Sequence, residues 1–350
     1  MSTEETEGIA MRASRLLALT ATALLAIPLA GCSMGDGGGA DSAAAAGGDG
    51  YPVVIDHALG QTTVTEKPER VATVAWANHE VPLALGVVPV GMSKATWGDD
   101  DGDGVLPWVE DKLDELGADT PVLFDETDGI DFEAVAATDP DVILAAYSGL
   151  TQEEYDTLTK IAPVVAYPEV AWGTSVQQMI ELNAQALGEQ AKGEQLIAEL
   201  DAEVQGTLDT HPEMRDTKFL FSYIDASDLS KIGFYTSHDT RPGFLADLGL
   251  PLPEVVAEES AKTEGFYAEI SAEQADRLAD VDVLVTYGDP NGDLIKRLQA
   301  DPLLAQIPAV KAGHIAVLPD ATPLAASANP SPLSIGWGID RYFDALAAGI

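Results

Sequence analysis

The feature that most constrains the fold is a long segment without internal proline in the middle of the chain, from Thr174 to His211. Apolar residues recur along it at helical spacing, with a threonine and a serine that can cap its start and a proline just past its end. Gly188 and Gly193 weaken its middle by about 1 kcal/mol each relative to alanine. We expect one helix over residues 173–212, long enough to connect two domains.

Short apolar runs alternate with helix-like stretches on both sides of this segment. The runs cover residues 53–55, 71–75, 87–90, 122–124, 142–147 and 164–167 before it, and residues 218–224, 232–236, 281–287 and 314–318 after it. Such alternation is typical of α/β domains with largely parallel sheets. The sequence therefore predicts an α/β protein with an N-terminal lobe over residues 51–172 and a C-terminal lobe over residues 213–350.

The two halves repeat local arrangements in the same order. Residues 83–89 and 245–251 each form a helix-like stretch that ends at a glycine and leads into an apolar run. Residues 131–147 and 270–287 each place a carboxylate in a first helical turn and end the following strand in tyrosine. These repeats, on either side of one long helix, indicate two Rossmann-like lobes of related build.

The N-terminus is expected to be a targeting segment and not part of the fold. Arg12 and Arg15 precede an apolar stretch, residues 16–29, that is too short for an ordinary transmembrane helix. Met11 is the expected start, because the acidic residues after Met1 are out of place ahead of a basic signal region.

Residues 29–32, Leu-Ala-Gly-Cys, resemble a bacterial lipobox, in which the cysteine becomes the mature N-terminus and carries the lipid. Cys32 is the only cysteine in the chain, and residues 32–50 are rich in Gly, Ala, Ser and Asp, as a flexible tether would be. We expect a signal peptide over residues 1–31 and a mature protein anchored by lipid to the outer face of the cytoplasmic membrane. The alternative is a plain secretory signal with a chance cysteine.

The chain is strongly acidic, with 18 Lys and Arg against 58 Asp and Glu and a formal net charge of −40. Such a chain repels nucleic acid and anionic lipid, so we expect neither as a partner, and membrane contact only through the lipid anchor. With so few cations, an arginine or lysine near a binding site carries more meaning than usual.

Residues 97–110, WGDDDGDGVLPWVE, fit the calcium-loop pattern D-x-[DN]-x-[DN]-G-x5-E. The candidate ligands are Asp99, Asp101, Asp103 and Glu110. The preceding residues have a strand-and-loop pattern, so the entering helix of an EF-hand is missing, and we expect no metal site. A calcium ion that stiffens this loop and a calcium-dependent adhesive lipoprotein stay open as alternatives.

The chain resembles the substrate-binding lipoproteins of ABC importers for ferric siderophores, haem and vitamin B12, and their iron-siderophore branch most. The likeness lies in residues 57–91, 131–149, 239–253, 270–288 and 301–318, and the order of these segments is more specific than any one of them. It implies a class III periplasmic-binding-protein fold, two lobes joined by one long α-helix, in a monomer without a cofactor. It also implies a receptor and not an enzyme, which captures a ferric siderophore between its lobes and delivers this iron chelate to a permease driven by a cytoplasmic ATPase.

The same resemblance implies that one acidic residue on each lobe docks on arginines of the permease, and Glu133 and Glu273 fall at those positions. Two carboxylates on separate lobes would fix both position and orientation on a two-fold partner. The alternative is ordinary helix chemistry, because acids in a first turn interact favourably with the helix macrodipole.

The binding site should lie between the lobes, where strand ends converge. The candidate ligand-binding residues at such ends are Trp76, Trp97, Tyr147, Trp172, Tyr223, Tyr235, Arg241 and Tyr287. Aromatic faces suit a large ligand, although each aromatic taken singly is as often core as contact. Arg241 offers a donor fork for an anionic ferric chelate, and a salt bridge to Asp239 or Asp225 is the equal alternative.

Two alternatives to siderophore binding stay open. Haem or cobalamin is the alternative ligand within the class, and a secreted glycoside hydrolase is the alternative outside it, since carboxylates are plentiful. The sequence has no G-x-S-x-G, S-x-x-K, H-E-x-x-H or P-loop motif. None of the five histidines has a two-histidine ligand spacing, which argues against direct transition-metal binding, and we expect His79 and Glu80 near the cleft.

Overall fold

The computed structural model describes residues 50–225 and 227–350. The predicted signal peptide, the lipid-bearing Cys32 and the tether up to residue 49 lie outside these residues and stay predictions. Within the described part of the chain, no helix combines the length and the apolar character needed to cross a membrane.

The N-terminal lobe is built on a five-stranded parallel sheet with the strand order β5-β4-β3-β6-β7. Its strands are β3 (Val71–Thr73), β4 (Gly91–Ser93), β5 (Val122–Phe124), β6 (Val142–Leu144) and β7 (Val164–Val165), preceded by an antiparallel ribbon of β1 (Val53–His57) and β2 (Gly60–Val64). Every residue of β3 and β6 is buried, as expected for parallel strands covered on both faces. The strand predicted at residues 87–90 begins later, at Gly91, and the sequence pattern does not predict β2.

The helices of this lobe are α1 (Glu80–Ala84), α2 (Pro107–Leu116), α3 (Phe132–Ala137) and α4 (Gln152–Leu158). Local sequence explains where several begin. The Asp131 carboxylate accepts a hydrogen bond from the Ala134 N–H at 2.9 Å at the start of α3, and Thr151 and Glu154 form a capping box at the start of α4.

The C-terminal lobe has a mixed five-stranded sheet with the strand order β10-β9-β8-β11-β12. The strands are β8 (Phe219–Tyr223), β9 (Lys231–Tyr235), β10 (Tyr267–Ser271), β11 (Val283–Gly288) and β12 (Ile315–Pro319). β8, β11 and β12 are parallel, whereas β9 and β10 add an antiparallel edge. The sequence pattern does not predict β10, because this edge strand is mostly exposed and lacks a continuous apolar run.

The helices of the C-terminal lobe lie around this sheet. They are η2 (Pro212–Asp216), α7 (Thr240–Asp247), α8 (Glu254–Ser260), η3 (Ala272–Leu278), α9 (Leu294–Ala300), η4 (Leu304–Gln306), α10 (Pro308–Ala312), α11 (Pro323–Ser327) and α12 (Pro332–Ala347), of which η2, η3 and η4 are 3-10 helices. Together the two lobes confirm the predicted α/β fold class.

One long helix connects the lobes, as expected, but it begins later than residue 173, because the segment over residues 173–212 is divided into two helices. α5 (Val176–Ala186) ends and α6 (Gln190–Asp209) begins on either side of Gly188, whose φ of 67° is left-handed. The N–H of Gly188 and that of the next residue donate to carbonyls three and five residues back, the bond pattern of a Schellman cap. The Tyr51 hydroxyl donates at 2.9 Å to the carbonyl of the last α5 residue. Gly188 therefore ends a helix where the prediction treated it only as a weak position.

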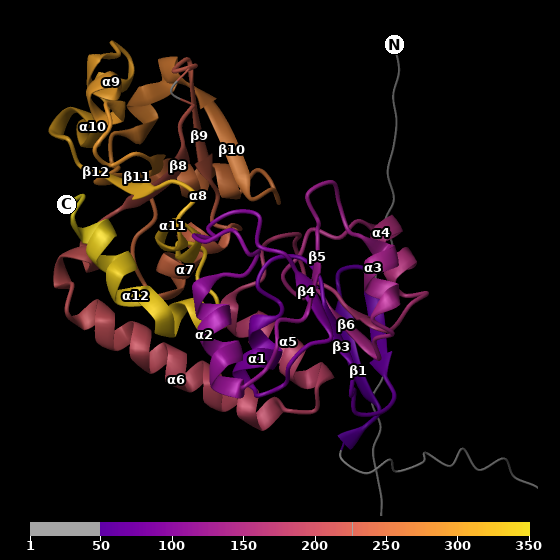
Figure 1. Cartoon of the computed structure of the whole chain (residues 1–350). Helices are drawn as coiled ribbons and strands as arrows, with labels where there is room; N and C mark the ends of the chain where they lie inside the picture. Colours follow the sequence, from indigo (N-terminus) through magenta and orange to yellow (C-terminus); the bar gives the residue numbers. More distant parts are fainter. Residues whose placement is uncertain (1–49, 226) are drawn as a thin grey trace, which may run out of the picture. The chain divides into compact units, whose positions relative to one another are not determined.

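α12 is a second connection between the lobes. Figure 1 shows it beside α6, and it packs against α1 and α2 of the N-terminal lobe as well as against β12. Trp337 in its first half joins the cluster around Trp108 of the N-terminal lobe, whereas Tyr342 in its second half lies in the main core. The backbone of α12 is kinked between these halves, at Gly338. Part of the segment expected to form the C-terminal lobe therefore packs on the N-terminal lobe.

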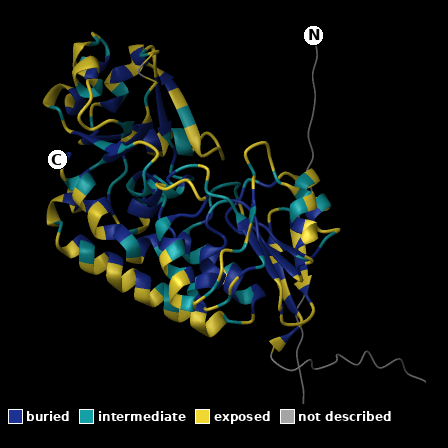
Figure 2. Ribbon diagram, viewed as in Figure 1, coloured by how far each residue is buried: buried dark blue, intermediate teal, exposed yellow. Residues whose placement is uncertain are grey.

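The apolar core is continuous across both lobes. One cluster of buried residues contains Val142 of β6 and Val285 of β11 together with the inward faces of α5, α6 and α12. Figure 2 shows buried residues concentrated in the two sheets and exposed residues along the outer face of α6. The lobes are thus held together by shared packing and not only by the chain that connects them.

Candidate ligand-binding site

A cavity of about 260 Å³ is lined by residues from both halves of the chain. Its lining residues are Trp76, Trp97, Tyr147, Trp172, Asp239, Arg241, Phe266 and Asn329. A larger cavity, of about 390 Å³, lies between the starts of α5 and α7 and has no Trp, Tyr, Lys or Arg in its lining. The smaller cavity is the better candidate, because it combines broad aromatic faces with a few convergent polar groups.

The N-terminal lobe supplies tryptophans mounted on unusual backbone. Trp172 has a left-handed φ of 61°, and its N–H donates to the Ser148 carbonyl at 2.8 Å. Its indole packs edge-to-face on the Tyr147 ring, with the ring centroids 5.4 Å apart. Gly149 allows this approach, since a Cβ there would lie 2.1 Å from the indole nitrogen of Trp172. These contacts hold the aromatic wall in place before a ligand arrives.

A polar network joins the two lobes beside the aromatic wall. The Asn329 amide Nδ2 donates to the Tyr147 hydroxyl at 3.1 Å, and the Thr240 hydroxyl donates to Asn329 Oδ1. Tyr147 and Thr240 are also within hydrogen-bond distance, at 3.3 Å between their hydroxyl oxygens. Burial raises the pKa of Tyr147, so its hydroxyl stays neutral and able to donate. Because three distant parts of the chain meet here, the cavity depends on the relative placement of the lobes.

Arg241 is the one cation in the cavity lining, and it is paired. Its Nη1 donates to Asp239 Oδ2 at 2.8 Å, and its backbone N–H donates to the other oxygen of the same carboxylate at 2.9 Å. The side chains of Arg241 and Asp239 are only 17% and 4% exposed. Burial disfavours the arginine charge, but Asp239 and the neighbouring tyrosines outweigh this and raise the pKa of Arg241. The guanidinium carbon also lies 4.2 Å from the centroid of the Tyr235 ring, a cation–π contact.

The guanidinium retains unused hydrogen-bonding capacity. Arg241 Nε is buried, and no group among the residues 50–225 and 227–350 accepts its hydrogen. A buried donor without an acceptor is costly to the fold. The cavity is therefore an aromatic chamber with one ion pair of zero net charge.

Comparison with known proteins identifies the family to which this chain belongs. The sequence model of the periplasmic binding protein family matches residues 71–322, most of the described chain. The chain belongs to the periplasmic binding protein family.

Several known proteins are similar to the chain over most of its length. The crystal structure of PiaA from Streptococcus pneumoniae in complex with ferrichrome is 49% identical, covers 85% of this chain and 98% of its own, and superposes with a TM-score of 0.81. The ferric-anguibactin-binding protein of Vibrio anguillarum is 28% identical over 283 residues, 75% of this chain and 79% of that protein. A probable siderophore-binding lipoprotein of Bacillus subtilis is 28% identical over 241 residues, 67% of each.

The cavity of this periplasmic binding protein contains five of the eight candidate ligand-binding residues: Trp76, Trp97, Tyr147, Trp172 and Arg241. Tyr235 lies under Arg241, and the Tyr287 ring packs edge-to-face on Trp97 at 5.7 Å, so both support the lining from behind. Burial raises the pKa of Tyr287 to about 12. Tyr223 ends β8 with 57% of its surface exposed and does not line the cavity.

Three lining residues are absent from the candidate set. Phe266 directly precedes the unpredicted strand β10, and Asn329 lies in the turn between α11 and α12. Asp239 enters the lining together with Arg241, and the salt bridge to Asp239, one of the alternatives for Arg241, is present. The pattern Asp-Thr-Arg-Pro at a helix start signals Asp239 as an N-cap, whereas no periodicity marks Phe266 or Asn329.

His79 and Glu80 start α1, next to the turn that carries Trp76, and do not themselves line the cavity. Both side chains are buried, and burial lowers the pKa of His79 to about 4. The Glu80 carboxylate accepts hydrogen bonds from the Trp108 indole at 2.7 Å and from the Leu333 N–H at 2.8 Å. Glu80 thus joins α1 to α2 and to the start of α12. Its role is structural, because its side chain does not line the cavity.

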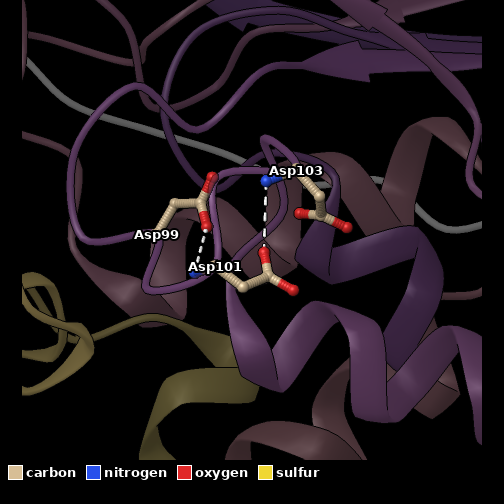
Figure 3. A group of neighbouring side chains, drawn as sticks. All are labelled: Asp99, Asp101 and Asp103. Carbon is tan, nitrogen blue, oxygen red and sulfur yellow. Dashed lines mark hydrogen bonds between the residues drawn. The ribbon is translucent and has the colours of Figure 1, made fainter.

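The calcium-like loop folds through its own hydrogen bonds. Figure 3 shows Asp99, Asp101 and Asp103 together, and oxygens of the three carboxylates lie within 4.8 Å of one another. Asp99 accepts from the N–H groups of Asp101, Gly102 and Gly104 at 2.7–3.1 Å. Partial burial and then the charges of Asp103 and Asp101 raise the pKa of Glu110, which lies in the first turn of α2 beside the loop. β4, and no helix, precedes the loop, as the sequence indicates, and calcium binding stays an untested alternative.

The two acids expected to dock the permease occupy corresponding places in the lobes. Glu133 lies in the first turn of α3 and Glu273 in the first turn of η3, and both are exposed. Neither forms a salt bridge with a cation of the described residues, so both carboxylates are accessible to a partner.

Proposed function

We propose that this periplasmic binding protein is the lipid-anchored, extracytoplasmic receptor of an ABC importer, and that it captures a ferric siderophore in the cavity between its lobes. The observation that carries this proposal is the convergence of Trp76, Trp97 and Trp172 with Arg241 in one cavity that both lobes complete. Broad aromatic faces suit the organic surface of a large chelate, and the guanidinium suits its iron-bound oxygens. The siderophore names of the relatives support the same ligand class.

The charge of the cavity favours one kind of ferric chelate over another. The sequence suggests an anionic chelate, because Arg241 is a rare cation in an acidic chain. In the cavity Asp239 neutralises Arg241, and no other lining residue is charged. A chelate with several negative charges would find no compensating cation, whereas an uncharged ferric hydroxamate needs none. The ferrichrome complex of the Streptococcus pneumoniae relative is in keeping with this preference.

Intrinsic tryptophan fluorescence tests the ligand. We expect ferrichrome to quench the emission, because three tryptophans line the cavity, and a ferric catecholate, ferric citrate, haem and cobalamin to quench it less at equal concentration. Arg241→Ala should weaken ferrichrome binding by roughly 10- to 100-fold, the loss of a charge-assisted hydrogen bond. Tyr223→Phe is the matched control, since Tyr223 lies outside the lining. Failure of every chelate to quench, together with hydrolysis of a glycoside panel, would exclude the receptor.

Delivery to the permease is tested separately. Reversing both charges, Glu133→Lys with Glu273→Lys, should abolish uptake of the iron chelate by cells and leave its affinity for the purified protein unchanged. Uptake that survives the double reversal would exclude docking through these acids. The anchor has its own test, because Cys32→Ser should release the protein from the membrane fraction into the medium or periplasm.

A further inference from the structure

The backbone on either side of Trp76 is in a conformation that residues other than glycine rarely adopt. Ala75 and Ala77, on either side of it, have φ values of 61° and 62°, both in the left-handed region. Residues other than glycine enter that region at a cost, and they stay there only where surrounding groups hold them. The turn that carries Trp76 into the cavity therefore needs support from outside itself.

Two side chains give that support. The buried Asn78 amide donates to the carbonyl of Val74 at 2.9 Å and to that of Trp76 at 3.3 Å. Glu126 Oε2 accepts from the Ala75 N–H at 2.9 Å and from the Ser93 hydroxyl at 3.1 Å. Asn78 thus fixes the carbonyls of the turn, and Glu126 fixes the N–H of its first strained residue.

We propose that Glu126 is a positioning residue for the bound ligand, because its carboxylate holds the Ala75–Ala77 turn that presents Trp76 to the cavity. The inference rests on the proposed function, since Trp76 matters to binding only where the cavity takes a ligand. Glu126 itself is not among the cavity-lining residues, so it acts through the turn.

The charge of Glu126 links this support to pH. Burial raises the pKa of Glu126 to about 7, the N–H of Ala75 and the hydroxyl of Ser93 oppose that rise, and Glu154 of α4 adds to it. The β3–α1 turn and β4 face the carboxylate with these two uncharged donors. A hydrogen bond to an ionised carboxylate is about twice as strong as one to its neutral form. Ligand affinity therefore falls as the pH drops through about 7.

The test compares ferrichrome affinity at pH 6 and pH 8 in the wild type, Glu126→Gln and Asp125→Asn. Glutamine keeps the shape of glutamate, can still accept from Ala75 and can donate to Ser93, so the variant is expected to fold. The wild-type Kd should rise several-fold from pH 8 to pH 6. Glu126→Gln should bind several-fold more weakly at pH 8 and lose this pH dependence. Asp125→Asn, the adjacent exposed acid, should keep it, and a pH dependence that survives in Glu126→Gln overturns the proposal.

A double-mutant cycle separates positioning from general damage. In a Trp76→Ala background, Glu126→Gln should change the ferrichrome Kd no further, because the side chain that it positions is gone. An undiminished effect in that background would mean that Glu126 acts on the lobe as a whole, and would overturn the inference.

A readout without ligand distinguishes failure of this inference from failure of the proposed function. The emission of Trp76, taken as the difference between the wild type and Trp76→Ala, should shift with a midpoint near pH 7. The corresponding difference measured with Glu126→Gln present should not shift. Absence of ferrichrome binding by the wild type would reject the proposed ligand, whereas a pH-independent Trp76 emission would reject the role of Glu126.

Discussion

Replacing Glu80 with glutamine should change how the stability of the protein depends on pH. The Glu80 carboxylate is fully buried and accepts from the Trp108 indole at 2.7 Å and from the Leu333 N–H at 2.8 Å. Burial raises the pKa of Glu80 from 4.5 to about 7, and the hydrogen bonds from Ser331, Leu333 and Trp108 only partly oppose it. Glu80 is therefore a group whose ionisation the fold disfavours.

The sign and size of the effect follow from that shift. The folded protein holds the Glu80 proton more tightly than the unfolded chain, so the stability that this provides is complete below about pH 4.5 and is lost as the pH rises through about 7. A shift of this size corresponds to about 3 kcal/mol in total, of which about 2 kcal/mol falls between pH 5.5 and pH 8. Glutamine does not titrate, so Glu80→Gln should lack this loss.

Urea unfolding at pH 5.5 and pH 8, followed by near-UV circular dichroism, measures the free energy of unfolding of both proteins. The free energy of unfolding of the wild type minus that of Glu80→Gln should fall by about 2 kcal/mol from pH 5.5 to pH 8. Glu133→Gln is the control, because its exposed side chain should leave the wild-type pH dependence unchanged. Equal pH slopes for the wild type and Glu80→Gln would refute the reasoning.

Two further predictions concern the cavity and the helix connection. Asp239→Asn should lower the free energy of unfolding by about 3 kcal/mol, because it leaves the charge of Arg241 unpaired. In fluorescence titrations, the same variant should gain affinity for an anionic ferric catecholate relative to ferrichrome. An unchanged ratio of these two affinities would contradict the charge argument. Gly188→Ala should lose about 1–2 kcal/mol of unfolding free energy, because the backbone of Gly188 is left-handed and a Cβ there would approach the Tyr51 hydroxyl to 2.8 Å. Gly206→Ala, in the exposed interior of α6, should instead gain about 0.5–1 kcal/mol. A change of the same sign for both variants in urea unfolding would contradict this role of Gly188.

The fold class and much of the cavity are predictable from the sequence because both leave local signals. Apolar runs bounded by helix-like stretches give the strands β3, β6, β8 and β11, and caps such as Asp131 fix helix starts. Aromatic residues at strand ends lead to Trp76, Tyr147 and their neighbours in the lining. The lone arginine of the cavity is conspicuous in a chain with so few cations.

The tertiary structure alone decides what depends on groups far apart in the sequence. The end of α5 is closed by Tyr51, 135 residues away, and Asn329 reaches the cavity by its bond to Tyr147, 182 residues away. Glu80 is buried because α12 arrives from 253 residues further along the chain. Local patterns set the conformation of a segment, since they reflect its own backbone and its exposed and buried faces. They carry no information on which distant segment packs there, and it is that packing which buried Glu80 and completed the cavity.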